Sequence, residues 1–256
     1  MTPKEVVLNA VAAIFTNFDP EAAEQLLAPG YIQHNPAVPT GAAPIVGFIP
    51  GLKESGIEVT THRVLAEGDL VVLHNTYTNA QAFGAEALVG FDVFRVEDRK
   101  VVEHWDNLEA VTEPNPSGHT QTDGAVEIVD LNKTEANKEL VVDFVNTILR
   151  DGKGDQITDF ISTETYTQHN SQIADGLDGL GAALTAWAEQ GITMKYDETH
   201  LVVAEGNFVF TASEGTLAGT PTAFFDLFRV EDGKIVEHWD VISDIPSEMA
   251  HENGKF

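Results

Sequence analysis

The sequence predicts an α+β protein made of two tandem domains, and two observations lead to this prediction. The segment FDVFRVEDRKVVEHWD at residues 91–106 returns as FDLFRVEDGKIVEHWD at residues 225–240, with 13 of 16 positions identical. Within each copy, residues with helical periodicity come first and residues with strand alternation follow. That order is typical of α+β domains rather than of alternating βαβ units.

The duplication extends over whole domains. YIQHN at 31–35 aligns with YTQHN at 166–170, and HRVLAEG at 62–68 aligns with HLVVAEG at 200–206, at offsets of 134 to 138 residues. Such an offset is far longer than the unit of a solenoid, and each copy can bury a core of its own. The predicted organisation is a first domain at 1–112, a linker rich in Pro, Gly and polar residues at 113–132, and a second domain with a C-terminal tail at 133–256.

Three helices are predicted at the start of the first domain. The first covers 4–16, where apolar residues recur at helical spacing. The second runs from Pro20 through Leu27 with Asp19 as its N-cap, and the third lies near 42–54. The pattern then changes to that of strands, which are predicted at 57–66, 70–77, 87–97 and 101–110.

The register of the repeated hairpin decides which side chains share a face of the sheet. A three-residue turn with a left-handed Gly233 would pair Asp226 with His238, and the same register in the first copy would pair Asp92 with His104. A two-residue turn would shift every pair by one residue. The first register is favoured because it also places the apolar Phe/Val pairs on the face that carries the aspartates.

Composition excludes several classes of function. Acidic residues outnumber basic ones 41 to 14, so the net charge of −27 disfavours nucleic acid and anionic membranes as partners. The absence of cysteine excludes disulfides, thiolate nucleophiles and Cys-ligated metals. The sequence has no apolar run long enough to span a bilayer and no signal-peptide pattern in its first ten residues. A cytoplasmic location is therefore expected.

The helix-then-strand order, the Tyr-x-Gln-His-Asn segment and the repeated hairpin motif resemble the SnoaL-like branch of the nuclear-transport-factor-2-like superfamily, once per copy. The resemblance implies two cone-shaped domains, each a curved antiparallel sheet wrapped by three N-terminal helices around a small-molecule pocket. It also implies activity without a cofactor. The hairpin motif is specific for the branch but weak on reaction, because one fold hosts many chemistries.

An Asp and a His on one concave apolar face form a plausible acid–base pair. Asp92 with His104, and Asp226 with His238, are therefore the candidate catalytic pairs. The resemblance places His34 and His169 at the pocket mouth and makes His74 a helper of the catalytic Asp. Because Ala212 aligns with His74, the first copy is the better-equipped site. The predicted ligand-binding residues are Tyr31, Asn35, Phe94, Trp105, Tyr166, Asn170, Phe228 and Trp239.

Other roles are expected for the tryptophans and for the aspartates that end the motif. Trp105 and Trp239 suit core or interface anchors better than ligand platforms, while Asp106 and Asp240 are expected to end their strands. A metal site from His34, His74, His104 and Asp92 is not favoured, because no close-spaced ligand pair supports it. We therefore expect no metal.

The favoured function is proton abstraction next to a carbonyl by an Asp base, as in a polyketide cyclase or an isomerase, acting on a small apolar carbonyl-bearing molecule. A non-catalytic ligand-binding module and an epoxide-hydrolase-like enzyme are the alternatives. Because a tether raises the effective concentration of one copy near the other, the two domains are expected to pair within one chain and leave a monomer in solution.

Overall fold

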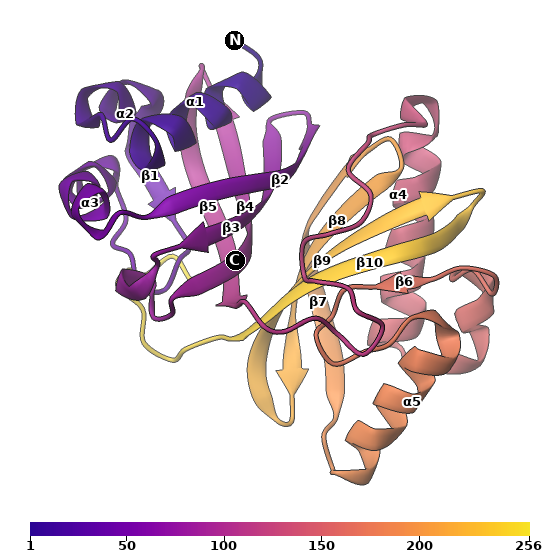
Figure 1. Cartoon of the computed structure of the whole chain (residues 1–256). Coiled ribbons are helices and arrows are strands. Elements are labelled where there is room, and N and C mark those ends of the chain that lie inside the picture. Colours follow the sequence, from indigo (N-terminus) through magenta and orange to yellow (C-terminus); the bar gives the residue numbers. More distant parts are fainter. The chain divides into compact units, whose positions relative to one another are not determined.

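The computed structural model describes residues 1–256, which divide into two compact units (Figure 1). Unit 1 consists of Met1–Val111 together with Pro246–Phe256, and unit 2 consists of Thr112–Ile245. Each unit packs helices against one five-stranded sheet, which confirms the predicted α+β class and the tandem arrangement. No helix combines the length and the apolar character that a bilayer crossing requires.

Unit 1 begins with helices whose ends are set by local sequence signals. Thr2 and Glu5 form a capping box at the start of the first helix, and Asp19 caps the second by accepting a hydrogen bond from the Ala22 N–H. The elements of unit 1 are α1 (Pro3–Phe15), α2 (Pro20–Leu26), β1 (Leu27–Gln33), α3 (Ala42–Ser55), β2 (Glu58–Glu67), β3 (Leu70–Thr78), η1 (Gln81–Phe83), β4 (Ala87–Glu97) and β5 (Lys100–Ala110).

The sheet of unit 1 has the strand order β1-β5-β4-β3-β2. Strands β2 to β5 form the predicted antiparallel meander, whereas β1 joins the edge of β5 in parallel. The sequence pattern does not show β1, because Pro29 and Gly30 interrupt its alternation. Pairing with β5 makes this segment a strand, and it brings Gln33 level with His104.

Unit 2 repeats this topology, with the strand order β6-β10-β9-β8-β7. Its β6 also lies parallel to the last strand of the hairpin. The elements of unit 2 are η2 (Leu131–Lys133), α4 (Thr134–Phe144), η3 (Val145–Arg150, a π-helical continuation of α4), η4 (Gly154–Asp159), β6 (Thr167–Gln168), α5 (Gly176–Glu189), β7 (Met194–Glu205), β8 (Phe208–Leu217), β9 (Thr220–Glu231) and β10 (Lys234–Asp244).

The hairpin has neither of the two predicted registers. Its turn contains two residues, and a bulge follows in the second strand, because Arg95 pairs with Glu103 while the next residue pairs with Val101. The bulge moves every later pair by one further residue, so that Asp92 lies opposite Asp106. In unit 2, Asp226 lies opposite Asp240 by the same shift. A bulge of this kind leaves no signal in a simple alternation pattern.

Two segments without helix or strand cover parts of the units. Residues 113–124, here called the unit 2 strap, lie in the predicted linker and pack on unit 2, where Asn115 donates hydrogen bonds to the carbonyls of Gln168 and Ile173. Residues 246–256, here called the unit 1 strap, belong to unit 1 although the sequence analysis assigned them to the second domain. There the Ala250 N–H donates to the Pro36 carbonyl.

Candidate functional site

Unit 1 encloses a cavity of about 410 Å³ between its helices and the inner face of its sheet. Apolar side chains from α1, α3 and β5 form most of the wall, including Val11, Ile14, Ile45 and Leu108. This apolar wall is interrupted by a small polar group, which consists of Tyr31, Gln33, Asn35, Asp92, His104 and Asp106. A mostly apolar pocket with a few convergent polar groups is the usual form of a small-molecule site.

Asp92 is the centre of the polar group. Its Oδ2 atom accepts hydrogen bonds from the Tyr77 hydroxyl at 2.6 Å and from Asn75 Nδ2 at 2.8 Å. Its Oδ1 atom lies 3.1 Å from Nε2 of His104. Burial and the charge of Asp92 raise the pKa of Tyr77 well above its usual value, so the hydroxyl stays protonated as a donor. Three of the carboxylate's roughly four lone-pair sites are thus used within the protein.

The protonation of His104 follows from its second partner. Nδ1 of His104 lies 3.0 Å from Oε1 of Gln33, and that oxygen also accepts the backbone N–H groups of His34 and Asn35. An atom that accepts these bonds must be the amide oxygen, so Nδ1 of His104 carries a proton. The Nε2 atom therefore shares a single further proton with Asp92. The pair exists either as imidazolium and carboxylate or as imidazole and carboxylic acid.

A second carboxylate, Asp106, faces Asp92 across the hairpin. Its Oδ2 accepts from Asn35 Nδ2 at 2.6 Å, and its backbone carbonyl accepts from Nζ of Lys255 in the unit 1 strap at 2.6 Å. Burial lowers the pKa of Lys255, and the Asp106 charge acts against that change. β5 continues past Asp106 to Ala110, within the predicted range of 101–110 but against the expectation that Asp106 ends the strand. The Asp106 side chain is part of the cavity wall.

Tyr31 supplies a hydroxyl on the same wall. It accepts a weak hydrogen bond from Gln33 Nε2 at 3.4 Å, which leaves its own proton directed elsewhere. Burial, followed by the charges of Asp106 and Asp92, raises the pKa of Tyr31 well above its usual value. The Tyr31 hydroxyl therefore keeps its proton and is available as a hydrogen-bond donor to a ligand.

Unit 2 keeps all six residues of the polar group, but two partners of its aspartate differ: Ser213 aligns with Asn75, and the tyrosine comes from another strand. Asp226 Oδ1 lies 3.0 Å from Nε2 of His238, whose Nδ1 lies 3.0 Å from Oε1 of Gln168. The hydroxyl that donates to the Asp comes from Tyr196 on β7, because the position opposite it on β8 is Gly215. In unit 1 the corresponding tyrosine is on β3, so the contact is kept although the strand that supplies it differs.

The electrostatics of unit 2 favour a charged histidine. Burial lowers the pKa of His238, but the hydrogen bond to Asp226 and the charges of Asp240 and Asp226 outweigh it and raise the pKa overall. Burial raises the pKa of Asp240; the charge of His238 lowers it less, and that of Asp226 raises it further. Asn170 donates to both carboxylate oxygens of Asp240, whereas Asn35 donates to one oxygen of Asp106.

The interior of unit 2 carries larger side chains at aligned positions. Ala10 lines the cavity of unit 1, and the aligned residue in unit 2 is Phe144 at the end of α4. Phe144 is buried, with its ring centroid 5.6 Å from that of Phe228. Likewise Phe224, aligned with Gly90, stacks on Tyr196 at 4.3 Å. Phe144 thus occupies a position that Ala10 leaves open to the unit 1 cavity, whereas the space beside Gly90 is already filled by Leu108.

His74 does not lie with Asp92, contrary to the prediction. It pairs with Phe91, the neighbour of Asp92 on β4, and successive residues of a strand point to opposite faces. His74 Nδ1 lies 3.1 Å from a guanidinium nitrogen of Arg63, and its ring stacks on Phe91 at 4.3 Å. The alignment with Ala212 is correct, since Ala212 pairs with Phe225, but the shared position faces away from the aspartate.

His34 and His169 also point away from the aspartates. In unit 1 it is Gln33 that reaches His104, whereas His34 has its Nε2 3.0 Å from Glu103 and stacks on Trp105 at 4.9 Å. His169 likewise lies on Glu237 and stacks on Trp239 at 4.6 Å. These four rings thus pack on the outer side of the hairpin, and the histidines and tryptophans form one structural stack in each unit.

The remaining predicted ligand-binding residues divide between the units. Tyr31, Asn35 and Phe94 line the unit 1 cavity, and Phe94 stacks on His104 at 4.6 Å. Their counterparts Tyr166, Asn170 and Phe228 lie in or beside the core of unit 2. Sequence patterns did not predict Asn75, Tyr77 and Tyr196 as site residues, nor the site roles of Asp106 and Asp240. The spacing of two between His104 and Asp106 is the one signal that could have identified the second carboxylate.

Comparison with known proteins gives a family match and several structural likenesses. A family model described as SnoaL-like domain matches the chain twice, over residues 8–104 and 141–238. A search of curated proteins found no match.

Three solved structures are similar to part of this chain. IdmH of Streptomyces antibioticus, titled a proposed polyketide cyclase, is 18% identical and covers 43% of this chain and 93% of its own, with a TM-score of 0.35. An LEH-like epoxide hydrolase of M. tuberculosis is 18% identical and covers 42% of this chain and 82% of its own, with a TM-score of 0.35. A proposed ketosteroid isomerase of Kribbella flavida is 23% identical and covers 49% of this chain and 90% of its own, with a TM-score of 0.37.

Proposed function

Because this chain belongs to the SnoaL-like domain family, with one domain in each unit, we propose that the unit 1 cavity binds a small apolar carbonyl compound and removes a proton next to its carbonyl group. The observation that carries the proposal is the 3.1 Å contact between Asp92 Oδ1 and Nε2 of His104 on the wall of an apolar cavity. A carboxylate in such surroundings suits a general base, provided that a substrate carbon reaches it.

The roles of the side chains follow from their contacts. With His104 as imidazolium, Asp92 is a carboxylate whose remaining lone pair takes the proton from the substrate carbon. The electron pair of that C–H bond moves into a carbon–carbon double bond, and the carbonyl oxygen gains negative charge. The Tyr31 hydroxyl donates to this oxygen, as preorganised donors do in related chemistry. Returning the proton from Asp92 to another carbon completes an isomerisation. Attack of the enolate carbon on a second carbonyl group forms a carbon–carbon bond and closes a ring, and the new alkoxide oxygen takes the proton from Asp92.

A binding module without catalysis is the second candidate, and one observation favours it. Asp92 already accepts three hydrogen bonds, from Asn75, Tyr77 and His104. These three hydrogen bonds stabilise the carboxylate and make it a weaker base. Its one remaining lone pair can still accept a hydrogen bond from a ligand. Hydrolysis of an epoxide receives less support, because an Asp-Arg-Asp site of the kind expected for related epoxide hydrolases needs an arginine beside the aspartates. Arg63 and Arg95 instead contact His74 and Glu103 on the outer face of the sheet.

Solvent exchange distinguishes the first two candidates. The protein is incubated in D₂O with a panel of cyclic ketones and polyketide-like diketones, and deuterium next to the carbonyl is measured by mass spectrometry. Binding of the same compounds is measured by calorimetry. Exchange above the buffer rate that depends on Asp92 supports the enzyme. Tight binding of a panel member without exchange would make the binding module the better description.

A further inference from the structure

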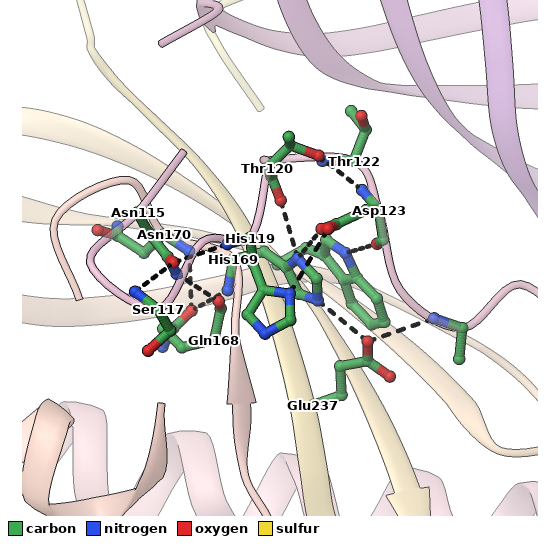
Figure 2. A network of polar contacts seen from close by, with 12 residues as sticks. Asn115, Ser117, His119, Thr120, Thr122, Asp123, Gln168, His169, Asn170 and Glu237 are labelled. Atoms are coloured by element: carbon green, nitrogen blue, oxygen red, sulfur yellow. Dashed lines mark hydrogen bonds and ion pairs between the residues drawn. The ribbon is translucent and has the colours of Figure 1, made fainter. Parts of the chain in front are cut away.

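A cluster in unit 2 lies outside the cavity and has no part in the proposed chemistry. It consists of His119 and Asp123 from the unit 2 strap and His169 from the segment after β6 (Figure 2). We infer that these three side chains form a binding site for one divalent transition-metal ion of the Zn²⁺ class. The inference rests on how the two imidazole rings are oriented, and it is independent of the proposed function.

Each oxygen of Asp123 faces a different histidine. Oδ1 lies 2.8 Å from Nδ1 of His169, and Oδ2 lies 3.5 Å from Nδ1 of His119. One ligand atom from each of the three residues lies within 4.8 Å of the others. Distances of about 3 Å between ligand atoms are those expected around an ion bound at 2.0–2.2 Å.

The other nitrogen of each ring is held by a second carboxylate. Nε2 of His169 lies 3.0 Å from Oε1 of Glu237, and Nε2 of His119 lies 3.2 Å from Oδ2 of Asp175. A carboxylate behind the imidazole fixes its orientation and raises its basicity as a ligand, an arrangement that recurs in metal sites. Both Nδ1 atoms are thereby presented to the same carboxylate.

All four ring nitrogens lie within 3.5 Å of a carboxylate oxygen, the inner pair near Asp123 and the outer pair near Glu237 and Asp175. A metal bound at the two Nδ1 atoms and Asp123 leaves the outer contacts unchanged. The carbonyl of Thr120, 2.8 Å from Nδ1 of His169, is a further oxygen at the same place.

The cluster is buried on the His169 side and exposed to solvent on the side of His119 and Asp123. His169 is fully buried, and Glu237 behind it is bound by the Arg229 guanidinium at 2.6 Å. The backbone carbonyl of Asp123 accepts from the Trp239 indole at 2.9 Å. The side chains of His119 and Asp123 are 33% and 44% exposed, which leaves a path for an ion.

Unit 1 offers a comparison within the same chain. His34 repeats the outer contacts of His169, since its Nε2 lies on Glu103, which Arg95 binds in turn. Its Nδ1, however, faces the Gly254 carbonyl of the unit 1 strap and no carboxylate. His251 lies near it, with ring centroids 6.4 Å apart. Two imidazoles without a shared carboxylate make a poorer site, so we expect one ion per chain, bound in unit 2.

Zinc titration of the full chain tests the site. Metal-free protein is titrated with ZnCl₂ by calorimetry, and Co²⁺ is used as a spectroscopic probe of nitrogen and oxygen ligands. We expect one equivalent of Zn²⁺ per chain and a higher melting temperature of unit 2, because a ligand of the folded state stabilises it. Asp123→Asn should weaken binding by about tenfold or more, a loss typical of changes in or next to a metal's ligands.

Two matched variants control for other histidines. His251→Ala removes the unit 1 imidazole near His34, and His200→Ala removes the imidazole of the exposed cluster with Glu198 and Glu214. Both should retain the wild-type affinity. Circular dichroism of metal-free Asp123→Asn should match the wild type, since its anchoring contact to Trp239 is through the backbone. Absence of stoichiometric binding, wild-type affinity in Asp123→Asn, or loss of binding in His200→Ala would overturn the inference.

Discussion

Asp92 and His104 meet diagonally across the β4–β5 hairpin, with the Asp92 carboxylate 3.1 Å from Nε2 of His104 although neither is the other's direct strand partner. Asp226 and His238 meet in the same way at 3.0 Å. The diagonal contact results from a two-residue turn followed by a bulge. It leaves the position opposite each Asp to a second carboxylate, and each unit therefore presents two carboxylates and one imidazole on one face.

Asp92→Asn is expected to reduce deuterium exchange by about 10²- to 10⁴-fold, the usual contribution of a general base. Folding and ligand affinity should remain close to wild type. The amide oxygen can accept from Asn75 and Tyr77, while the amide nitrogen donates to a neutral His104. Calorimetric binding and exchange rates measure the two effects separately. Wild-type exchange in this variant would rule out Asp92 as the base.

His74→Ala serves as the companion variant. Because His74 packs on Arg63 and Phe91 on the outer face, its loss should lower stability but change exchange by no more than a few-fold. A loss of exchange as large as that of Asp92→Asn, with binding unchanged, would contradict this placement.

Ala10→Phe should close the unit 1 cavity, because Phe144 already occupies the aligned position in unit 2. The added ring is expected to weaken binding of any cavity ligand at least tenfold while costing about 1–3 kcal/mol of stability from overpacking. Ligand titration with calorimetry, alongside a thermal melt, provides both values. Unchanged affinity would mean that the ligand binds elsewhere.

The pH dependence of unit 2 stability should depend on Asp240. Its pKa is raised in the folded state, so its stabilising contribution is fully present below about pH 3.8 and is lost as the pH rises through the folded value. At pH 7 the ionised side chain therefore costs stability, and Asp240→Asn removes this cost. We expect the variant to gain stability relative to wild type as the pH rises from 4 to 7, measured by urea unfolding. A constant difference between the two proteins would contradict this.

The two hairpin turns should differ in strain. Arg99 has a φ of 62°, whereas the corresponding position in unit 2 is Gly233 with a φ of 73°. A left-handed residue other than glycine costs about 1 kcal/mol or somewhat more. Arg99→Gly should therefore stabilise unit 1 by up to about 1 kcal/mol, and Gly233→Arg should destabilise unit 2 by a similar amount. Calorimetric melts of both variants check the opposite signs.

The chain is expected to be a monomer of 27.7 kDa in solution. A tethered second domain competes with dimerisation between chains through its high effective concentration. Light scattering on the full chain measures the mass directly. A stable species of twice this mass across a dilution series would show that chains associate.

The sequence alone determined the duplication, the α+β class, three N-terminal helices of unit 1 and the four strands of its meander. These features depend on local signals, such as the Asp19 cap and the alternation of apolar residues, and on the near-identity of the two hairpins. It also identified Asp92 and His104 as partners, because the register error of two residues keeps both side chains on one face, within reach of each other as diagonal neighbours.

Only the tertiary structure decided the composition of the site. The bulge after Val101 placed Asp106 opposite Asp92, and pairing of β1 with β5 brought Gln33, not His34, onto His104. Tyr196 replaces the hydroxyl of Tyr77 from a different strand, so no position-by-position alignment reveals it. The physical reason is common to these cases. Strand alternation specifies two faces locally, but bulges and the pairing of distant segments decide which face is inner and which side chains meet there.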